Sequence, residues 1–186
     1  MSKKLTRSQT EELAKKNGYE FAMLQSIINV ESGGHGFDPK TGKIIIQFEK
    51  SWFKRKKADW LKDTKNTVWQ SDQVGNQVSE WKYFNSAFYS DPNAAMESTS
   101  IGMMQVMGFH YKSLGFKTVG AMWDYAQESE ANQVDLAIRF IKNNPKLDKA
   151  VKEKNYRIIA YYYNGEQYEM FNYHTRLEAE RLKALR

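Results

Sequence analysis

The chain has 186 residues, a formal net charge of +6 and 14% aromatic residues. This length favours one domain with a substantial core, and the aromatic content excludes a largely disordered chain. Cysteine is absent, which excludes disulfides, thiol nucleophiles and cysteine-based metal sites and fits a reducing cytoplasm. The N-terminal segment MSKKLTRSQTEEL lacks the apolar run of a secretory signal, and no stretch has membrane-spanning length, so we expect synthesis in the cytoplasm without a signal peptide.

The chain begins with two predicted helices. The first covers residues 6–16, with a capping box at Ser8 and Glu11 and a stop at Gly18. The second covers residues 19–31, where apolar side chains recur at helical spacing until the glycines of the stretch VESGGHGF.

A short strand is predicted over residues 44–49, as one arm of a hairpin that follows the turn residues of DPKTG. Alternation divides its side chains between two faces: Ile44, Ile46 and Phe48 on one, and Ile45, Gln47 and Glu49 on the other. The polar residues from 51 to about 75 predict a surface excursion with little regular structure, in which the basic run at 54–57 is a solvated loop.

The rest of the chain is predicted to be mainly helical. An amphipathic helix covers residues 78–88, and Asp91 and Pro92 cap and open a short helix after it. Residues 100–111 are rich in methionine and are interpreted as core. Further helices are expected at 118–126, 129–142, 145–152, 156–163 and 175–185. The fold class is therefore mainly α (α+β), one domain over residues 1–186 with a small β element near residues 37–50.

Glu31, at the end of the second helix, is the first candidate for chemistry. Ile27 and Ile28 lie one turn earlier on the same face, so its carboxyl is expected to point toward packed side chains. Burial raises the pKa of a carboxyl, and an acid that stays protonated near neutral pH can donate a proton to a leaving group. The alternative is an ordinary helix-end glutamate, a position where the helix dipole disfavours negative charge.

Glu49, at the end of the strand, is the second candidate. A strand beside the end of the Glu31 helix would bring the two carboxyls across a cleft. Paired carboxylates in different environments are the machinery of glycoside hydrolysis. Taken alone, Glu49 next to Lys50 also fits a solvated charge.

Two more segments place polar residues in apolar surroundings. In TSIGMMQVMGFHY these are Ser100 and Gln105, and a buried glutamine amide needs a partner such as a sugar or a carboxylate. In AYYYNG they are Tyr163 and Asn164, which fit either a helix end before Gly165 or a polar pair presented at a cleft.

No cofactor or metal site is predicted. The histidines are far apart and lack metal-ligand spacing, and no phosphate-binding loop follows a strand. The positive charge would attract polyanions, but no nucleic-acid-binding motif accompanies it.

The segments VESGG, SIGMMQ and YYYNG occur in an order that resembles the lysozyme-like superfamily, which includes goose-type lysozymes and lytic transglycosylases. NVESGGHGF, IIQFEKSWF, SIGMMQVMGFHYKSLGF and YYYNGEQYEMFNYHTRLEAE are similar, in this order, to segments of the phage endolysin N-acetylmuramidase catalytic domain. The resemblance covers about residues 18–183, and several motifs in register are much more specific than any one alone.

This resemblance implies a lysozyme-like fold with a small β-hairpin beside the catalytic cleft. It implies hydrolysis of the β-1,4 bond between N-acetylmuramic acid and N-acetylglucosamine in bacterial peptidoglycan, and hence lysis. Glu31 would be the catalytic acid and Glu49 a second catalytic carboxylate. The substrate-binding residues would be Ser100, Gln105, Tyr163 and Asn164.

The chain also departs from the family's pattern. Ile101 occupies a position where an aromatic residue is usual, so one sugar-stacking contact is expected to differ, and Gln47 replaces an aliphatic residue. No separate cell-wall-binding module is expected, and the basic residues 54–57 are a hypothesis for wall binding, which salt would weaken.

Alternatives to hydrolysis stay open at this point. A lytic transglycosylase would need only Glu31 as acid and base, and a non-enzymatic wall-binding protein would need neither carboxylate. A basic helical protein that binds nucleic acid has the charge in its favour and no motif. The expected protein is a monomer that acts on the bacterial wall, with no nucleic-acid partner and no stable membrane insertion.

Overall fold

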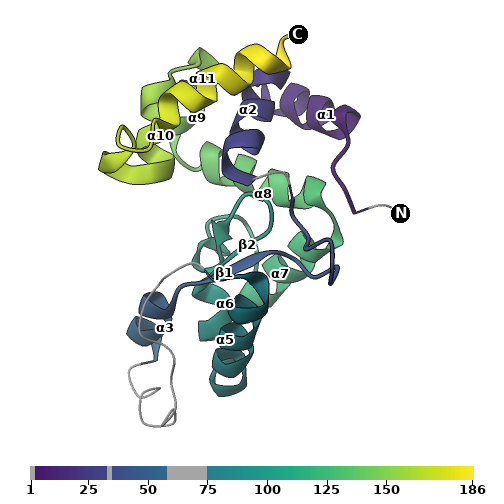
Figure 1. The fold of residues 1–186 in the computed structure, drawn as a ribbon, viewed down its shortest axis with the longest axis vertical. Coiled ribbons are helices and arrows are strands. Elements are labelled where there is room, and N and C mark those ends of the chain that lie inside the picture. Colours follow the sequence, from purple (N-terminus) through teal and green to yellow (C-terminus); the bar gives the residue numbers. More distant parts are fainter. Residues whose placement is uncertain (1–2, 33–34, 58–74) are drawn as a thin grey trace.

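The computed structural model describes residues 3–32, 35–57 and 75–186. Figure 1 shows two groups of elements joined by a helix between them, α8 (Glu130–Lys142). The first group, called here the helical lobe, contains α1 (Arg7–Asn17), α2 (Phe21–Ser32), α9 (Pro145–Glu153), α10 (Tyr156–Asn164) and α11 (Tyr173–Ala184). Within it, α11 packs along α2, and α10 contacts both α9 and α11.

The second group, called here the sheet lobe, is built around an antiparallel sheet in the order β1 (Ile46–Phe48), β2 (Thr99–Ile101) and β3 (Val106–Met107). Its helices are α3 (Lys50–Lys56), α5 (Gln77–Ser90), α6 (Pro92–Glu97) and α7 (Val119–Glu128). Short 3-10 turns occur at η1 (Gly108–His110) and η2 (Gly165–Gln167). The mainly helical fold class with a small β element is therefore confirmed.

The predicted helices are confirmed with small shifts at their ends. The expected stop at Gly18 is also confirmed, because this residue has a left-handed backbone with φ +72°. The capping box at Ser8 and Glu11 is wrong. The helix begins at Arg7, so the cap is Thr6, whose hydroxyl accepts from the amide of Gln9 while the Gln9 side chain accepts from the amide of Thr6.

For the predicted strand, the division of side chains between two faces is confirmed, but the expected pairing in a local hairpin is wrong. Ile44, Ile46 and Phe48 are all buried, as their alternation predicted. The local hairpin is reduced to one bridge, between Phe37 and Ile44, and β1 pairs with β2 instead, Gln47 opposite Ser100. Residues 100–111, predicted only as core, thus contribute two strands of the sheet.

The expected loop after residue 50 is wrong where the structure describes it. Residues 50–56 form α3, and the basic run 54–57 lies at its C-terminal end, where cations are favoured by the helix dipole. Lys56 forms an ion pair with Glu97, which ties α3 to α6. The remainder of the predicted excursion, residues 58–74, lies outside the described residues.

Two buried polar side chains of α8 hold neighbouring loops in place. The carboxylate of Glu130 accepts from the amides of Leu5 (2.7 Å) and Gly36 (2.9 Å). Gln133 accepts from the amide of Met103 (2.7 Å) and donates to the carbonyl of Ala126 (3.0 Å). Because buried polar groups require such partners, α8 fixes both the segment that follows α2 and the turn that follows β2.

No helix in the described part of the chain combines the length and the apolarity needed to cross a bilayer.

Candidate active site

A cleft of about 490 Å³ lies where α2 and α10 of the helical lobe face the sheet and α8. The predicted residues Glu31, Glu49, Ser100, Gln105 and Tyr163 all line it. The other lining residues are Gln47, Met104, Val106, Met107, His110, Ala137, Phe140 and Tyr162. The fold therefore gathers most of the predicted site from segments far apart in the sequence. Asn164 is the last residue of α10, and its side chain lies outside what the structure describes.

Glu31 supplies a strongly perturbed carboxyl to the cleft. Its Oε1 atom is buried and has no hydrogen-bond partner in the described part of the chain. Burial raises the pKa of this carboxyl to about 8, although the positive charge of Arg176 opposes the shift. Arg176 reaches the end of α2 from α11 and donates to the carbonyl of Val30 (3.4 Å). The expected apolar surroundings of Glu31 are thus confirmed, and the group is a protonated acid at neutral pH.

Tyr163 presents a second unpartnered polar atom to the same cleft. Its hydroxyl is buried without a hydrogen-bond partner among the described residues. Burial raises the pKa of Tyr163, and the negative charge of Glu31 raises it further. The ring is fixed by stacking on Tyr173, with centroids 6.5 Å apart. Because buried polar atoms rarely stay unpaired, Glu31 and Tyr163 together mark a place for a polar ligand.

Glu49 is held at the sheet side of the cleft. Its amide donates to the carbonyl of Ser98 (2.8 Å), which fixes the end of β1. The side-chain amide of Gln47 donates to Glu49 Oε1 (2.7 Å), as expected for residues that alternation places on one face. Gln47 stands where the family usually has an aliphatic residue. Its side-chain amide orients the carboxylate of Glu49, which an aliphatic side chain does not do.

Ser100 and Gln105 bond to each other across the turn between β2 and β3. The Ser100 hydroxyl donates to Gln105 Oε1 (2.8 Å), and Gln105 Nε2 donates to the carbonyl of Gly102 (2.7 Å). These bonds hold Gln105 in a left-handed backbone conformation (φ +48°), which is unfavourable for a side chain of this kind. One N–H and one lone pair of the amide remain for a ligand.

The family model described as N-acetylmuramidase matches residues 20–184. The chain belongs to this family. The fold is also similar to a solved structure described as the Burkholderia AP3 phage endolysin, with a TM-score of 0.87 and 28% sequence identity over 98% of this chain and 71% of that one. A search of curated proteins found no match. The protein is a peptidoglycan-degrading muramidase, a glycoside hydrolase.

The muramidase cleft contains residues that the sequence did not indicate. His110 is half-buried against the ring of Phe140, with centroids 5.1 Å apart, and burial lowers its pKa. A lone histidine has no spacing signal in the sequence that would have placed it there. Ile101, in contrast, is buried in the core of the sheet and does not line the cleft, so the expected change of a sugar contact at this residue is wrong. Its neighbour Ser100 faces the cleft, and adjacent strand residues face opposite sides.

The described residues contain no group of three or more histidine, aspartate or glutamate side chains placed to hold a metal ion.

The muramidase is expected to become more stable at neutral pH when Glu31 is replaced by glutamine. The pKa of Glu31 is about 8 in the folded chain against an ordinary value of 4.5. Between these values the folded state keeps a proton that the unfolded state has lost, so the free energy of unfolding falls as pH rises. Glu31→Gln removes this loss of stability, which amounts to about 3 kcal/mol at pH 7.

Urea unfolding at about pH 5 and pH 7.5, on either side of most of this titration, measures the effect. The stability difference between Glu31→Gln and wild type should widen with pH. The exposed Glu12 on α1 provides the control, because Glu12→Gln should show no widening. A constant difference for Glu31→Gln would contradict the buried-acid assignment.

Proposed function

We propose that the protein is a phage endolysin that cleaves the β-1,4 bond between N-acetylmuramic acid and N-acetylglucosamine, with Glu31 as general acid. The observation that carries the proposal is the buried Glu31 carboxyl with its raised pKa, in one cleft with a second, hydrogen-bonded carboxylate at Glu49. The similarity to a structure described as a phage endolysin supports the biological role.

In the first step, protonated Glu31 donates its proton to the glycosidic oxygen as the bond to the sugar carbon breaks. Positive charge then develops on the sugar ring in an oxocarbenium-like transition state. Glu31 becomes a carboxylate in this step, and the nearby positive charge of Arg176 favours that form. Burial thus keeps Glu31 protonated before the reaction, while the charge of Arg176 stabilises the carboxylate that forms when the proton is transferred.

Glu49 acts on the developing cation or on the attacking water. Its carboxylate, oriented by Gln47, either stabilises the positive ring carbon or guides the water that replaces the leaving group. Both roles require a negative charge at this place, so the neutral Glu49→Gln variant should lose hydrolysis by about 100-fold or more.

Gln105, Tyr163 and Asn164 position the sugar. The free N–H and lone pair of Gln105 and the unpartnered hydroxyl of Tyr163 are suited to the acetamido and hydroxyl groups of the substrate. Ser100 acts through Gln105, whose amide it holds. Such orientation matters because small misplacements of reacting groups cost large factors in rate.

Mass spectrometry of the fragments released from purified peptidoglycan tests the proposal. Wild type should release fragments that end in reducing N-acetylmuramic acid, Glu31→Gln should release none, and Glu49→Gln should release them slowly. Anhydro ends, with full activity of Glu49→Gln, would replace hydrolysis by lytic transglycosylation. If wild type released no fragments, the alternative of a non-enzymatic wall-binding protein would replace the proposal.

The proposed cellular role follows from this reaction. The enzyme is made in the cytoplasm of the infected host and acts as a monomer on the peptidoglycan of the wall, without a nucleic-acid partner or stable insertion in the membrane. Sedimentation of the purified protein and a titration with DNA at physiological salt check the oligomeric state and the absence of a nucleic-acid partner.

A further inference from the structure

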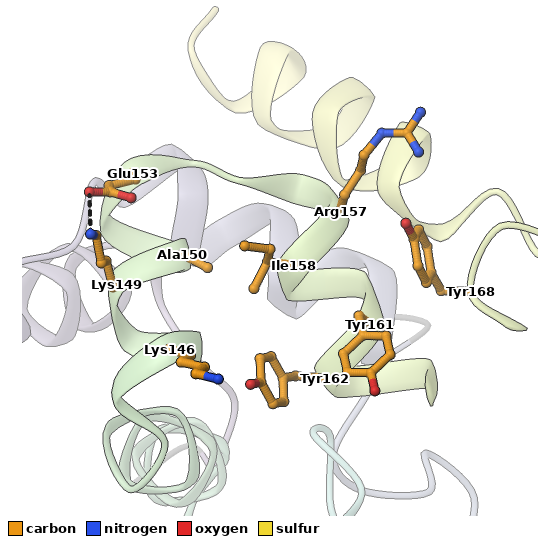
Figure 2. A pocket seen from close by; sticks show the side chains of 9 residues that line it. All are labelled: Lys146, Lys149, Ala150, Glu153, Arg157, Ile158, Tyr161, Tyr162 and Tyr168. Atoms are coloured by element: carbon orange, nitrogen blue, oxygen red, sulfur yellow. Dashed lines mark ion pairs between the residues drawn. The ribbon is translucent and has the colours of Figure 1, made fainter. Parts of the chain in front are cut away.

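A second cavity, called here the tyrosine groove, lies between α9 and α10 and has a volume of about 480 Å³ (Figure 2). Its lining combines aromatic, aliphatic and basic side chains, including Lys146, Lys149, Ile158, Tyr161, Tyr162 and Tyr168. None of the reaction steps described above uses it.

The tyrosine groove meets the catalytic cleft at Tyr162. This side chain lines both cavities, whereas its neighbours Tyr161 and Tyr163 each line only one of them. The catalytic cleft and the tyrosine groove are therefore neighbours that share the ring of Tyr162.

Among the residues that the structure describes, Lys146 is the groove cation without an ion-pair partner. Lys149 is paired with Glu153 at 3.7 Å, and Arg157 is paired with Glu169 at 2.6 Å. In Figure 2 the guanidinium of Arg157 points away from the cavity, whereas the ammonium of Lys146 points toward the hydroxyl of Tyr162. Lys146 makes no ion pair with any residue that the structure describes.

The middle of the groove is apolar and open to solvent. Ile158 is 41% exposed and Tyr161 is 45% exposed, so both present apolar surface to a ligand. Ala150 forms part of the floor and is buried. The groove therefore fits a ligand with small apolar groups along its length and an anion at the end where Lys146 and Tyr162 meet.

We propose that the tyrosine groove binds the acidic peptide stem of the peptidoglycan unit whose sugars lie in the catalytic cleft. This inference rests on the proposed function. A stem is attached to the muramic acid ring and carries carboxylates together with the methyl groups of alanine. Its first carboxylate would bind Lys146 and the Tyr162 hydroxyl, next to the cleft, and its methyl groups would lie on Ile158 and Tyr161.

Steady-state kinetics on two substrates tests this inference. One substrate is intact peptidoglycan, and the other is the same glycan after an amidase has removed the stems. For Lys146→Gln we expect KM on the intact substrate to rise by about three- to tenfold, because one exposed charge contact is lost, with kcat unchanged. KM on the stem-free glycan should equal that of wild type. Tyr161→Ala should show the same selectivity.

Lys117→Gln is the matched control, because it removes the same charge from an exposed lysine that lines neither cavity. Equal losses on both substrates would mean that the groove binds glycan. Equal losses for Lys146→Gln and Lys117→Gln would reduce the effect to general attraction between a basic protein and an acidic wall. Either of these results, or unchanged KM, would overturn the proposal.

A direct binding measurement separates this proposal from the proposed function. The stem tripeptide is titrated into Glu31→Gln while NMR follows the resonances of the groove tyrosines. Shifts that vanish when Lys146→Gln is added would support the groove as a peptide site, and absence of shifts would overturn it. If wild type released no fragments from either substrate, the proposed function would fail, and the titration would still report on the groove.

Discussion

Glu31→Gln is expected to lower the rate of peptidoglycan cleavage by about a thousandfold or more, the usual scale for loss of a general acid. Glutamine has nearly the same shape as glutamic acid, but its amide does not act as an acid, so the leaving oxygen would depart without a proton. Because the variant is also expected to be more stable than wild type at neutral pH, loss of activity would not be explained by unfolding.

The pH profile of wild type adds a second readout to this prediction. Glu31 must be protonated to act, and its pKa is raised to about 8, so cleavage should persist at neutral pH and decline as pH rises through about 8. Glu31→Asp is the comparison variant, because it keeps a carboxylic acid on a side chain that is shorter by one methylene. It should retain some activity with an alkaline limb of its own. Activity of Glu31→Gln within tenfold of wild type would remove Glu31 from the mechanism.

Gly108→Ala is expected to destabilise the protein by about 3 kcal/mol or more, because it forces an atom into occupied backbone space. A Cβ atom at Gly108 would lie 2.0 Å from the carbonyl oxygen of Met96 and 2.8 Å from its carbon, both at the end of α6. These are backbone atoms, so a change of side-chain rotamer cannot relieve the overlap. The contact places η1, which carries His110, against α6, so the cleft wall would move with it.

Gly42→Ala is the matched control for this prediction. Gly42 has φ +69°, and apart from its chain neighbours no heavy atom of the described residues lies within 4 Å of the added Cβ. Its substitution is therefore expected to cost only backbone strain of about 1–2 kcal/mol. Urea unfolding followed by circular dichroism compares the two variants. Equal stabilities would show that η1 and α6 separate easily, contrary to the packing seen here.

Local pattern in the sequence predicted the helices that the structure describes, α3 excepted, and it left Glu31 open between a buried acid and an ordinary helix-end glutamate. The helical spacing that ends at Glu31 and the alternation from Ile44 to Glu49 are patterns among residues close in the sequence. They were therefore sufficient to predict which faces of α2 and β1 are buried. The buried alternative for Glu31 rested on Ile27 and Ile28 in the same way. The resemblance to muramidase segments then supplied the expected roles of Ser100, Gln105 and Tyr163, and all of them line the cleft.

Long-range pairing was not visible in the sequence. The pairing of β1 with β2 depends on the helices between them, and residues 99–107 lack the alternation that marks a strand in isolation. Helix α3 was missed because its short basic segment resembles a solvated loop. The hydrogen bonds of Gln133 to Met103 and Ala126 join segments that no local pattern connects, and His110 reaches the cleft only through the same tertiary packing.

The bridge made by Glu130 has a consequence for proteolytic processing of the N-terminus. Its two carboxylate oxygens join the amide of Leu5 to that of Gly36, and its own amide donates to the carbonyl of Lys3. Trimming through Leu5 would leave one of these oxygens buried without its donor, beside the segment that follows Glu31. A clipped protein is therefore expected to hold the segment at Gly36 less firmly, although Gly36 keeps its own bond to Glu130. The first few residues thus help to fix a segment that neighbours the proposed active site.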